Sequence, residues 1–236
     1  MSTTPKPAIV DAKAVRSCES LAGMALPNTT IAFATADAAN SNICRITAIT
    51  THPPSGDKVT IWVAIPIANW NGRFLGNGGG AFAGGEATDV DRGVALGFAS
   101  GATDTGHEGG RGGGEFALDA NGRLNWEAIR DFAHVGIHDM TVTGKALTQA
   151  MYGVAPKYSY WNGCSTGGRQ GLMEAQRYPQ DYDGIAAAAP AINMTNTVMQ
   201  GLWAPCRCRP PPTRSRRASS LRSPPRRSQR VTAWTA

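Results

Sequence analysis

Long apolar runs, a leader pattern and clustered cysteines are all missing from this sequence. No run of about 18 apolar residues occurs, which excludes a transmembrane helix and predicts no membrane partner. The N-terminus, MSTTPKPAIVDAKAV, lacks the basic start and apolar core of a secretory signal, so no signal peptide is visible. Cys206 and Cys208 are too close together for a zinc pair, and no metal site is predicted.

Acidic residues and lysine are missing from the last part of the chain. From Cys206 onward there are nine Arg and no Lys, Asp or Glu, whereas the first 205 residues hold 14 basic and 17 acidic groups. The formal net charge of +6 therefore belongs to the tail, and the body of the chain predicts no nucleic-acid partner. A basic arm for nucleic acid is the competing interpretation of the tail, although such arms usually contain Lys as well as Arg.

The distribution of β-branched, apolar and glycine residues predicts an α/β fold. Residues 42–51 and 58–67 are dense in β-branched residues and flank a turn, which indicates an antiparallel pair of strands. The order of the elements predicts a mainly parallel sheet with flanking helices. Further strands are expected at 73–80, 94–102, 158–161 and 185–192, and helices at 126–152 and 166–178.

The stretch YSYWNGCSTGG contains a GxSxG pattern between an expected strand and an expected helix. This context indicates a nucleophile elbow, in which Ser165 lies on a strained turn with its hydroxyl exposed. Side chains at Gly163 and Gly167 would collide across such a turn, so glycine is expected at both.

A glycine run, RFLGNGGG at 73–80, precedes the elbow. The Lys and Ser/Thr of a phosphate-binding loop are missing, which argues against a nucleotide site. Backbone amides of such a loop can supply half of an oxyanion hole, and the residue after the nucleophile, Thr166, supplies the other half.

All four histidines lie before Ser165. In the loop TDTGHEGGRGGG, Asp104, His107 and Glu108 allow a catalytic or metal interpretation, but bracing of the loop by Asp104 and His107 is favoured. His134 and His138 are four residues apart on one expected helix face; without a third ligand they are interpreted as polar surface residues.

Cys18 and Cys44 are candidates for a disulfide, which would indicate an oxidising compartment. Two buried free thiols are the alternative.

Four segments together resemble the tannase and feruloyl esterase family of α/β hydrolases: GCSTGGRQG, LGNGGGAFAGG, SGATDTGH and RYPQDYDGIAAAAPA. The resemblance covers residues 15–203. It implies a secreted or periplasmic serine esterase that cleaves gallate, ferulate or related aromatic acid esters with a Ser, Asp, His triad. It also implies a lid domain with a structural calcium, and no cofactor for catalysis.

The resemblance assigns roles to four residues. Ser165 is the nucleophile, and the amides of Thr166 and Gly80 are the oxyanion donors. Cys164 matches a cysteine that pairs with one beside the catalytic histidine. Ester cleavage then runs through an acyl-enzyme on Ser165.

One departure from the family pattern is clear. In this fold the triad follows the order Ser, Asp or Glu, His, yet no histidine follows Ser165 and no acidic residue follows Asp183. We therefore expect residues 1–203 to be the N-terminal part of an esterase domain. The triad partners, the lid, the calcium site and the partner of Cys164 are expected to be absent.

Residues 204–236 are rich in Arg, Pro and Ser and predict a disordered segment. We interpret them as out-of-frame sequence, because a shifted frame permits an amphipathic, helix-favouring continuation. Two alternatives to an active esterase remain: a catalytically inactive truncated fragment, and another serine hydrolase or acyltransferase. The sequence specifies neither the ester nor the oligomeric state.

Overall fold

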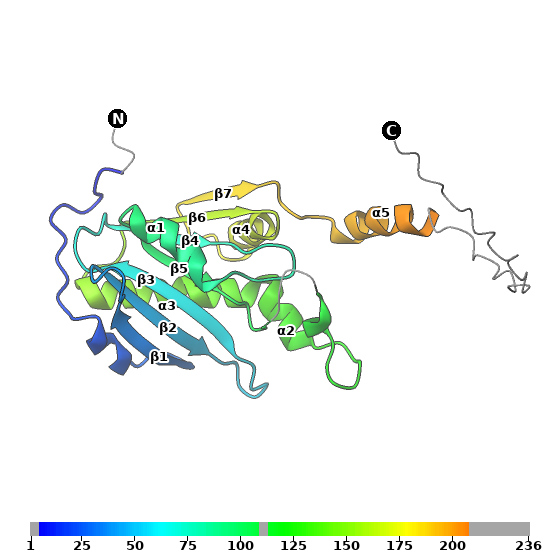
Figure 1. The fold of residues 1–236 in the computed structure, drawn as a ribbon, viewed down its shortest axis with the longest axis horizontal. Helices are drawn as coiled ribbons and strands as arrows, with labels where there is room; N and C mark the ends of the chain where they lie inside the picture. Colours follow the sequence, from blue (N-terminus) through cyan, green and yellow to red (C-terminus); the bar gives the residue numbers. More distant parts are fainter. Residues whose placement is uncertain (1–4, 109–112, 208–236) are drawn as a thin grey trace, which may run out of the picture. The chain divides into compact units, whose positions relative to one another are not determined.

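A seven-stranded sheet forms the centre of the first of two compact units, Met1–Ile192 (Figure 1). The computed structural model describes residues 5–108 and 113–207. The strand order is β1-β2-β3-β5-β4-β6-β7. The strands are β1 (Thr29–Ala36), β2 (Ile43–Thr50), β3 (Val59–Pro66), β4 (Arg73–Asn77), β5 (Ala99–Thr103), β6 (Tyr158–Cys164) and β7 (Gly184–Ala188).

The sheet is mixed, with an antiparallel half and a parallel half. β1, β2, β3 and β5 are antiparallel neighbours, whereas β5, β4, β6 and β7 are parallel neighbours. Five strands, all except β1 and β3, therefore run in one direction. The predicted mainly parallel α/β sheet is confirmed, and so is the predicted antiparallel pairing of β2 with β3.

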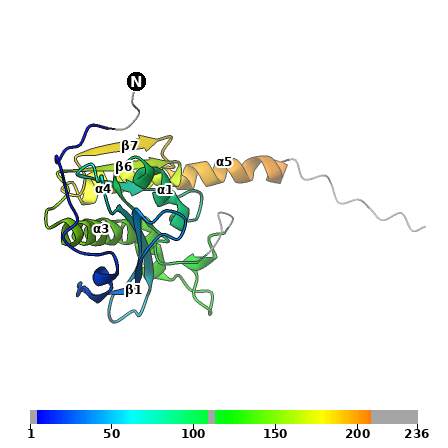
Figure 2. The ribbon, with the colours of Figure 1, turned by 60° about the vertical axis from the view of Figure 1, so that its left-hand side comes forward.

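Helices cover both faces of this sheet (Figures 1 and 2). A side chain at Gly101 of β5 would collide with Met140 of α3, whereas its neighbour Ser100 meets Gly93 of α1. Adjacent strand residues point to opposite faces, so α1 and α3 lie on opposite sides. The helices of this unit are η1 (Glu19–Gly23), η2 (Ala87–Val90), α1 (Asp91–Ala95), η3 (Glu115–Ala117), α2 (Trp126–Arg130), the π-turn η4 (Asp131–Val135), α3 (Gly136–Tyr152) and α4 (Thr166–Arg177).

Two predicted strands need correction, and one strand was missed. The expected strand at 94–102 begins only at Ala99, because Val94 ends the short helix α1 and Gly97 forms a turn at φ 82°. The expected strand at 185–192 ends at Ala188, since Ala189 has φ 36° and Pro190 follows. Strand β1 was not predicted. The helix expected at 126–152 is continuous through α2, η4 and α3, and its glycines do not interrupt it.

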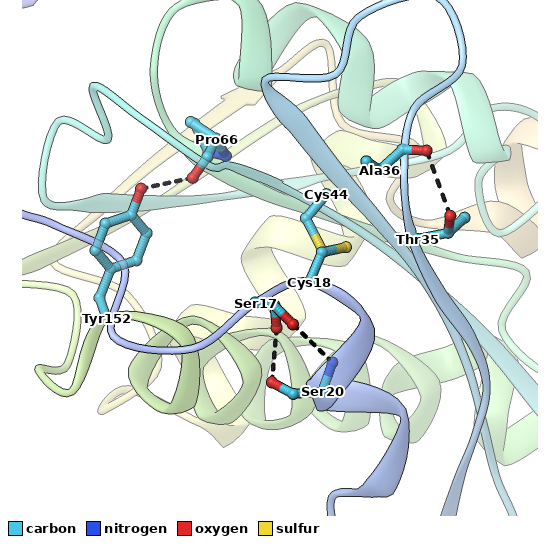
Figure 3. The surroundings of a disulfide bond; sticks show 8 residues. All are labelled: Ser17, Cys18, Ser20, Thr35, Ala36, Cys44, Pro66 and Tyr152. Atoms are coloured by element: carbon cyan, nitrogen blue, oxygen red, sulfur yellow. Dashed lines mark hydrogen bonds between the residues drawn. A yellow bond between two sulfur atoms is a disulfide. The ribbon is translucent and has the colours of Figure 1, made fainter.

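A disulfide joins Cys18, at the start of η1, to Cys44 in β2 (Figure 3). The two Cα atoms are 5.4 Å apart, and both side chains are buried. The predicted pairing is confirmed, and the alternative of two free thiols is wrong. Closing a loop of this length stabilises the fold by about 3–4 kcal/mol in the chain-entropy account.

The second unit, Asn193–Ala236, contains helix α5 (Met194–Arg207). Most of the segment predicted to be disordered, residues 204–236, lies outside the described residues, so that prediction stays a prediction. Across 5–108 and 113–207, the helices are too short or too polar to cross a bilayer.

Candidate active site

Ser165 lies at the junction between β6 and α4 and has φ 59° and ψ −117°. A residue with a side chain rarely adopts these angles, which cost on the order of 1–3 kcal/mol and persist only where neighbours hold them. The Ser165 amide donates to the Ala188 carbonyl at 3.1 Å, and the Ser165 carbonyl accepts from the Ala191 amide at 3.0 Å. These two hydrogen bonds, to the end of β7 and to the segment that follows it, therefore fix the backbone conformation of Ser165. The predicted strained turn with an exposed serine is present.

Steric contacts explain the glycines around Ser165. A Cβ at Gly163 would lie 2.4 Å from the Gly167 backbone, so a side chain there is excluded across the turn as predicted. A Cβ at Gly167 would instead lie 3.0 Å from the backbone of Gly78. The second glycine therefore serves the approach of the glycine loop rather than the turn itself.

Helix α4 holds the glycine loop against the elbow. The Gly167 amide donates to the Gly79 carbonyl at 2.9 Å, and the Thr166 hydroxyl donates to the Ala81 carbonyl. The buried side chain of Gln170 accepts from the Gly79 amide and donates to the Gly84 carbonyl, both at 3.0 Å. Gln170 was not singled out in the sequence, where its only signal is a polar residue on the buried side of a helix.

A pocket of about 280 Å³ opens at Ser165. It brings together two of the predicted residues, Ser165 and Gly80; Thr166 adjoins Ser165 but does not line the pocket. In the described ranges, the amides of Gly80 and Thr166 make no hydrogen bond to protein. The lining consists of Gly78, Gly79, Gly80, Ala83, Gly85, Glu86, Asp89, Cys164 and Ser165.

Carboxylates and a cation flank this pocket, and sequence reasoning missed them. Glu86 and Asp89 lie in its wall, and the Glu86 amide donates to Asp89 Oδ2 at 2.7 Å. A second pocket of about 260 Å³ shares Asp89 and Cys164 and adds Arg92. Glu86 also accepts from the Asp89 backbone amide, so a capping box fixes the two carboxylates beside Ser165.

The loop that follows β5 is braced as predicted. Asp104 Oδ1 accepts from the amides of Thr60 and Gly106 at 2.8 and 2.7 Å. Burial raises the pKa of Asp104, and these hydrogen bonds oppose the shift. His107 Nε2 lies 2.7 Å from the Phe82 carbonyl oxygen, and Glu108 is exposed.

His134 and His138 do not form a ligand pair. His134 Nδ1 lies 2.8 Å from the Tyr178 hydroxyl, and His138 Nδ1 lies 2.7 Å from Asp181 Oδ2. Both are half-buried and link the long helix, at η4 and α3 respectively, to the segment that follows α4, so the surface interpretation was incomplete. Of the histidines that the structure describes, none lines the pocket at Ser165.

Cys164 is an exposed free thiol in the described part of the chain and lines both pockets. Its expected pairing with a cysteine beside a catalytic histidine stays a prediction.

Comparison with known proteins places this site in a family. The family model described as tannase and feruloyl esterase matches residues 44–209. A probable feruloyl esterase of Arthroderma benhamiae is 41% identical over 180 residues, which are 75% of this chain and 32% of that protein. Feruloyl esterase B of Aspergillus niger is 38% identical over 169 residues, 70% of this chain and 30% of that protein.

A solved structure shows the same fold. The crystal structure of feruloyl esterase B from Aspergillus oryzae superposes with a TM-score of 0.67 at 32% identity, covering 78% of this chain and 39% of that one. The fold is of the α/β-hydrolase type, and the chain spans about a third of the length of the relatives named above. Because the family match covers most of the chain and includes both the glycine loop and the elbow, the protein belongs to the tannase and feruloyl esterase family.

Proposed function

We propose that this chain is the nucleophile-bearing part of a serine carboxylic ester hydrolase that cleaves aromatic acid esters such as ferulates or gallates. The observation that carries the proposal is the strained backbone of Ser165 at the head of α4, facing a pocket walled by the glycine loop. Strain of this kind is typical of functional sites, because it holds a side chain where relaxed backbone would not.

The proposed reaction has two steps. The Ser165 oxygen attacks the carbonyl carbon of the ester, its proton passes to a general base, and the alcohol leaves with a proton. Water then attacks the acyl-enzyme, releasing the acid and restoring the Ser165 hydroxyl. The amides of Gly80 and Thr166, which have no protein acceptor among the described residues, would donate to the oxyanion. The structural calcium expected in the lid takes no part in either step.

The pocket chemistry agrees with a phenolic substrate. Glu86 and Asp89 are hydrogen-bond acceptors in the pocket wall, and phenolic hydroxyls are donors. The related proteins are named for feruloyl ester and tannin substrates, which both carry such hydroxyls.

A catalytically silent chain is the second candidate, and the pocket lining favours it. A general base has to accept the Ser165 proton, yet the described residues that line the pocket include no imidazole. Loss of the base in a serine hydrolase reduces turnover by on the order of a million-fold.

Turnover of methyl ferulate and methyl gallate by the purified chain separates the two candidates. An active esterase would hydrolyse these esters, and its turnover would be lost in Ser165→Ala and retained in Ser41→Ala, a control in an exposed loop. A folded chain with no Ser165-dependent turnover would contradict the esterase proposal and support the silent one. Transfer of the acyl group to an added alcohol in preference to water would indicate an acyltransferase.

We also propose an extracytoplasmic location, because the buried Cys18–Cys44 disulfide is typical of oxidising compartments. Recovery of the native protein from cytosol with both thiols reduced would contradict this.

A further inference from the structure

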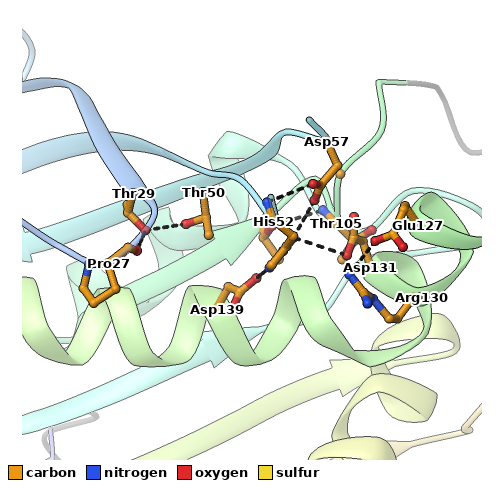
Figure 4. A network of polar contacts seen from close by, with 12 residues as sticks. Pro27, Thr29, Thr50, His52, Asp57, Thr105, Glu127, Arg130, Asp131 and Asp139 are labelled. Atoms are coloured by element: carbon orange, nitrogen blue, oxygen red, sulfur yellow. Dashed lines mark hydrogen bonds and ion pairs between the residues drawn. The ribbon is translucent and has the colours of Figure 1, made fainter. Parts of the chain in front are cut away.

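A cluster of one imidazole and three carboxylates lies away from Ser165, between the β2–β3 turn and the helix that covers it (Figure 4). His52 Nδ1 lies 2.5 Å from Asp57 Oδ2 and 3.8 Å from Asp131 Oδ1. His52 Nε2 lies 2.9 Å from Asp139 Oδ2. His52 and Asp57 come from the turn, Asp131 from the π-turn η4, and Asp139 from α3. The elements thus converge on one imidazole.

Asp131 is the unusual member of this cluster. Its side chain is completely buried, and neither carboxylate oxygen accepts a hydrogen bond. Buried polar groups in native proteins almost always have a partner, and a buried carboxylate without one costs several kcal/mol. Asp131 also lies in a π-turn, a distortion that is frequent at functional sites. The carboxylate points to a ligand that completes its contacts.

The local charge favours a cation as that ligand. The cluster combines three carboxylates with a single imidazole, and the nearby Arg130 guanidinium is paired with Glu127 at 2.5 Å. In the described ranges no Lys or Arg forms an ion pair with Asp57, Asp131 or Asp139. A divalent cation would neutralise most of the negative charge of these carboxylates.

We propose that His52, Asp57 and Asp131 bind a divalent transition-metal ion, Mn²⁺ or Zn²⁺. Each residue offers a ligand atom, and these atoms lie within 4.8 Å of one another. Carboxylates suit Mn²⁺, imidazole suits Zn²⁺, and the mixed set disfavours Ca²⁺ and Mg²⁺, which prefer oxygen alone.

Asp139 is the positioning residue of this site. Metal-binding histidines usually present their other ring nitrogen to a carboxylate, which fixes the tautomer and the ring orientation. Asp139 stands beside Nε2 and so favours a proton there. A bound ion would replace the proton that Nδ1 donates to Asp57, and Nδ1 would then coordinate the ion. Asp57 is itself held, because its Oδ1 accepts from the His52 amide at 2.9 Å.

The imidazole of this cluster borders the surface on its Asp139 side. A pocket of about 210 Å³ is lined by His52 and Asp139 and opens between the start of β1 and α3. A bound ion would link the β2–β3 turn to η4. None of the three ligands lines the pocket at Ser165, so the ion is expected to stabilise the fold rather than to take part in ester cleavage.

The test uses the full chain without a histidine tag, stripped with EDTA and then titrated with Mn²⁺, Zn²⁺, Ca²⁺ or Mg²⁺. Bound metal is measured by elemental analysis after gel filtration, and the melting temperature by circular dichroism. We expect one equivalent of Mn²⁺ or Zn²⁺, a higher melting temperature, and a weaker response to Ca²⁺ and Mg²⁺. Asp131→Asn and Asp57→Asn should each weaken metal binding at least tenfold. Asp11→Asn, at an exposed carboxylate, should bind as the wild type does.

Asp57→Asn is the second variant because the turn is partly exposed and tolerates substitution better than the buried Asp131. Two results would overturn the proposal: no metal retained by the folded wild type, or undiminished retention by both Asn variants.

Discussion

Glu174 and Gln170 are two fully buried polar side chains on the same helix, α4, and they differ in how they are satisfied. Gln170 makes two hydrogen bonds to the glycine loop, whereas neither carboxylate oxygen of Glu174 has a hydrogen-bond partner. Burial, followed by the charge of Asp181, raises the pKa of Glu174 to about 9. Gln170 therefore positions the glycine loop beside Ser165, whereas Glu174 makes the free energy of unfolding depend on pH.

Glu174→Gln is expected to flatten that pH dependence. Glu174 stays protonated in the folded chain up to about pH 9, while in the unfolded chain it ionises near pH 4.3, so the unfolded state binds fewer protons between these values. The free energy of unfolding of the wild type should therefore fall as pH rises from 5 to 8, by up to about 1.4 kcal/mol per pH unit. Urea unfolding across this range measures it. If the free energy of unfolding changed with pH equally in the wild type and in Glu174→Gln, the raised pKa of Glu174 would be contradicted. Glu19→Gln, an exposed substitution, is the control and should behave as the wild type does.

Gln170→Ala is expected to lower both stability and reactivity at Ser165. It leaves the Gly79 amide and the Gly84 carbonyl without their partner, at a cost of about 2–6 kcal/mol for the two groups. Urea unfolding gives the stability, and turnover of methyl ferulate gives the reactivity. Gln149→Ala removes the same side chain from an exposed site on α3 and should change neither. Equal behaviour of the two variants would show that Gln170 does not hold the loop.

At the scale of elements, the elbow and the glycine loop form one unit because backbone meets backbone. Gly78 and Gly167 approach so closely that a Cβ at Gly78 would lie 2.4 Å from the Gly167 Cα. The first turn of α4 thus packs directly against the loop that follows β4. The two elements are far apart in the sequence, but β4 and β6 are parallel neighbours and their carboxyl ends meet.

Gly163→Ala tests this close packing. Its Cβ would lie 2.4 Å from backbone atoms of Gly167, which a rotamer change cannot relieve, and overpacking of this kind costs about 1–3 kcal/mol. We expect a lower urea midpoint and a loss of turnover. Gly23→Ala is the matched control, since nothing lies within 4 Å of its Cβ position. Unfolding of both variants at the wild-type midpoint would rule out the steric account.

At the scale of the whole molecule, the sequence predicts those features that local pattern determines. The β-branched segments of β2 and β3, the helix after Ser165 and the spacing of Gly163 and Gly167 all carry their signal within a few residues. The strand predicted at 94–102 wrongly includes Val94, which lies in α1. A short run of small apolar residues has the same composition at a buried helix end as in a buried strand, so composition does not separate the two.

Long-range contacts explain what the sequence did not predict. Gln170 bonds to Gly79 and Gly84, and His52 meets Asp131, across separations that no local periodicity encodes. The pocket carboxylates Glu86 and Asp89 gain their position only when the loop after β4 folds over the elbow. The local geometry of the elbow was therefore predictable from one motif, whereas contacts that the sheet assembles from distant segments were not.

Covalent labelling tests whether Ser165 is the nucleophile of an esterase site. The folded chain is incubated with a fluorophosphonate ester, and the modified peptide is identified by mass spectrometry. We expect a single phosphonyl adduct on Ser165, absent from Ser165→Ala and retained in Ser41→Ala. A folded chain that remains unlabelled, or an adduct on another residue that persists in Ser165→Ala, would contradict it.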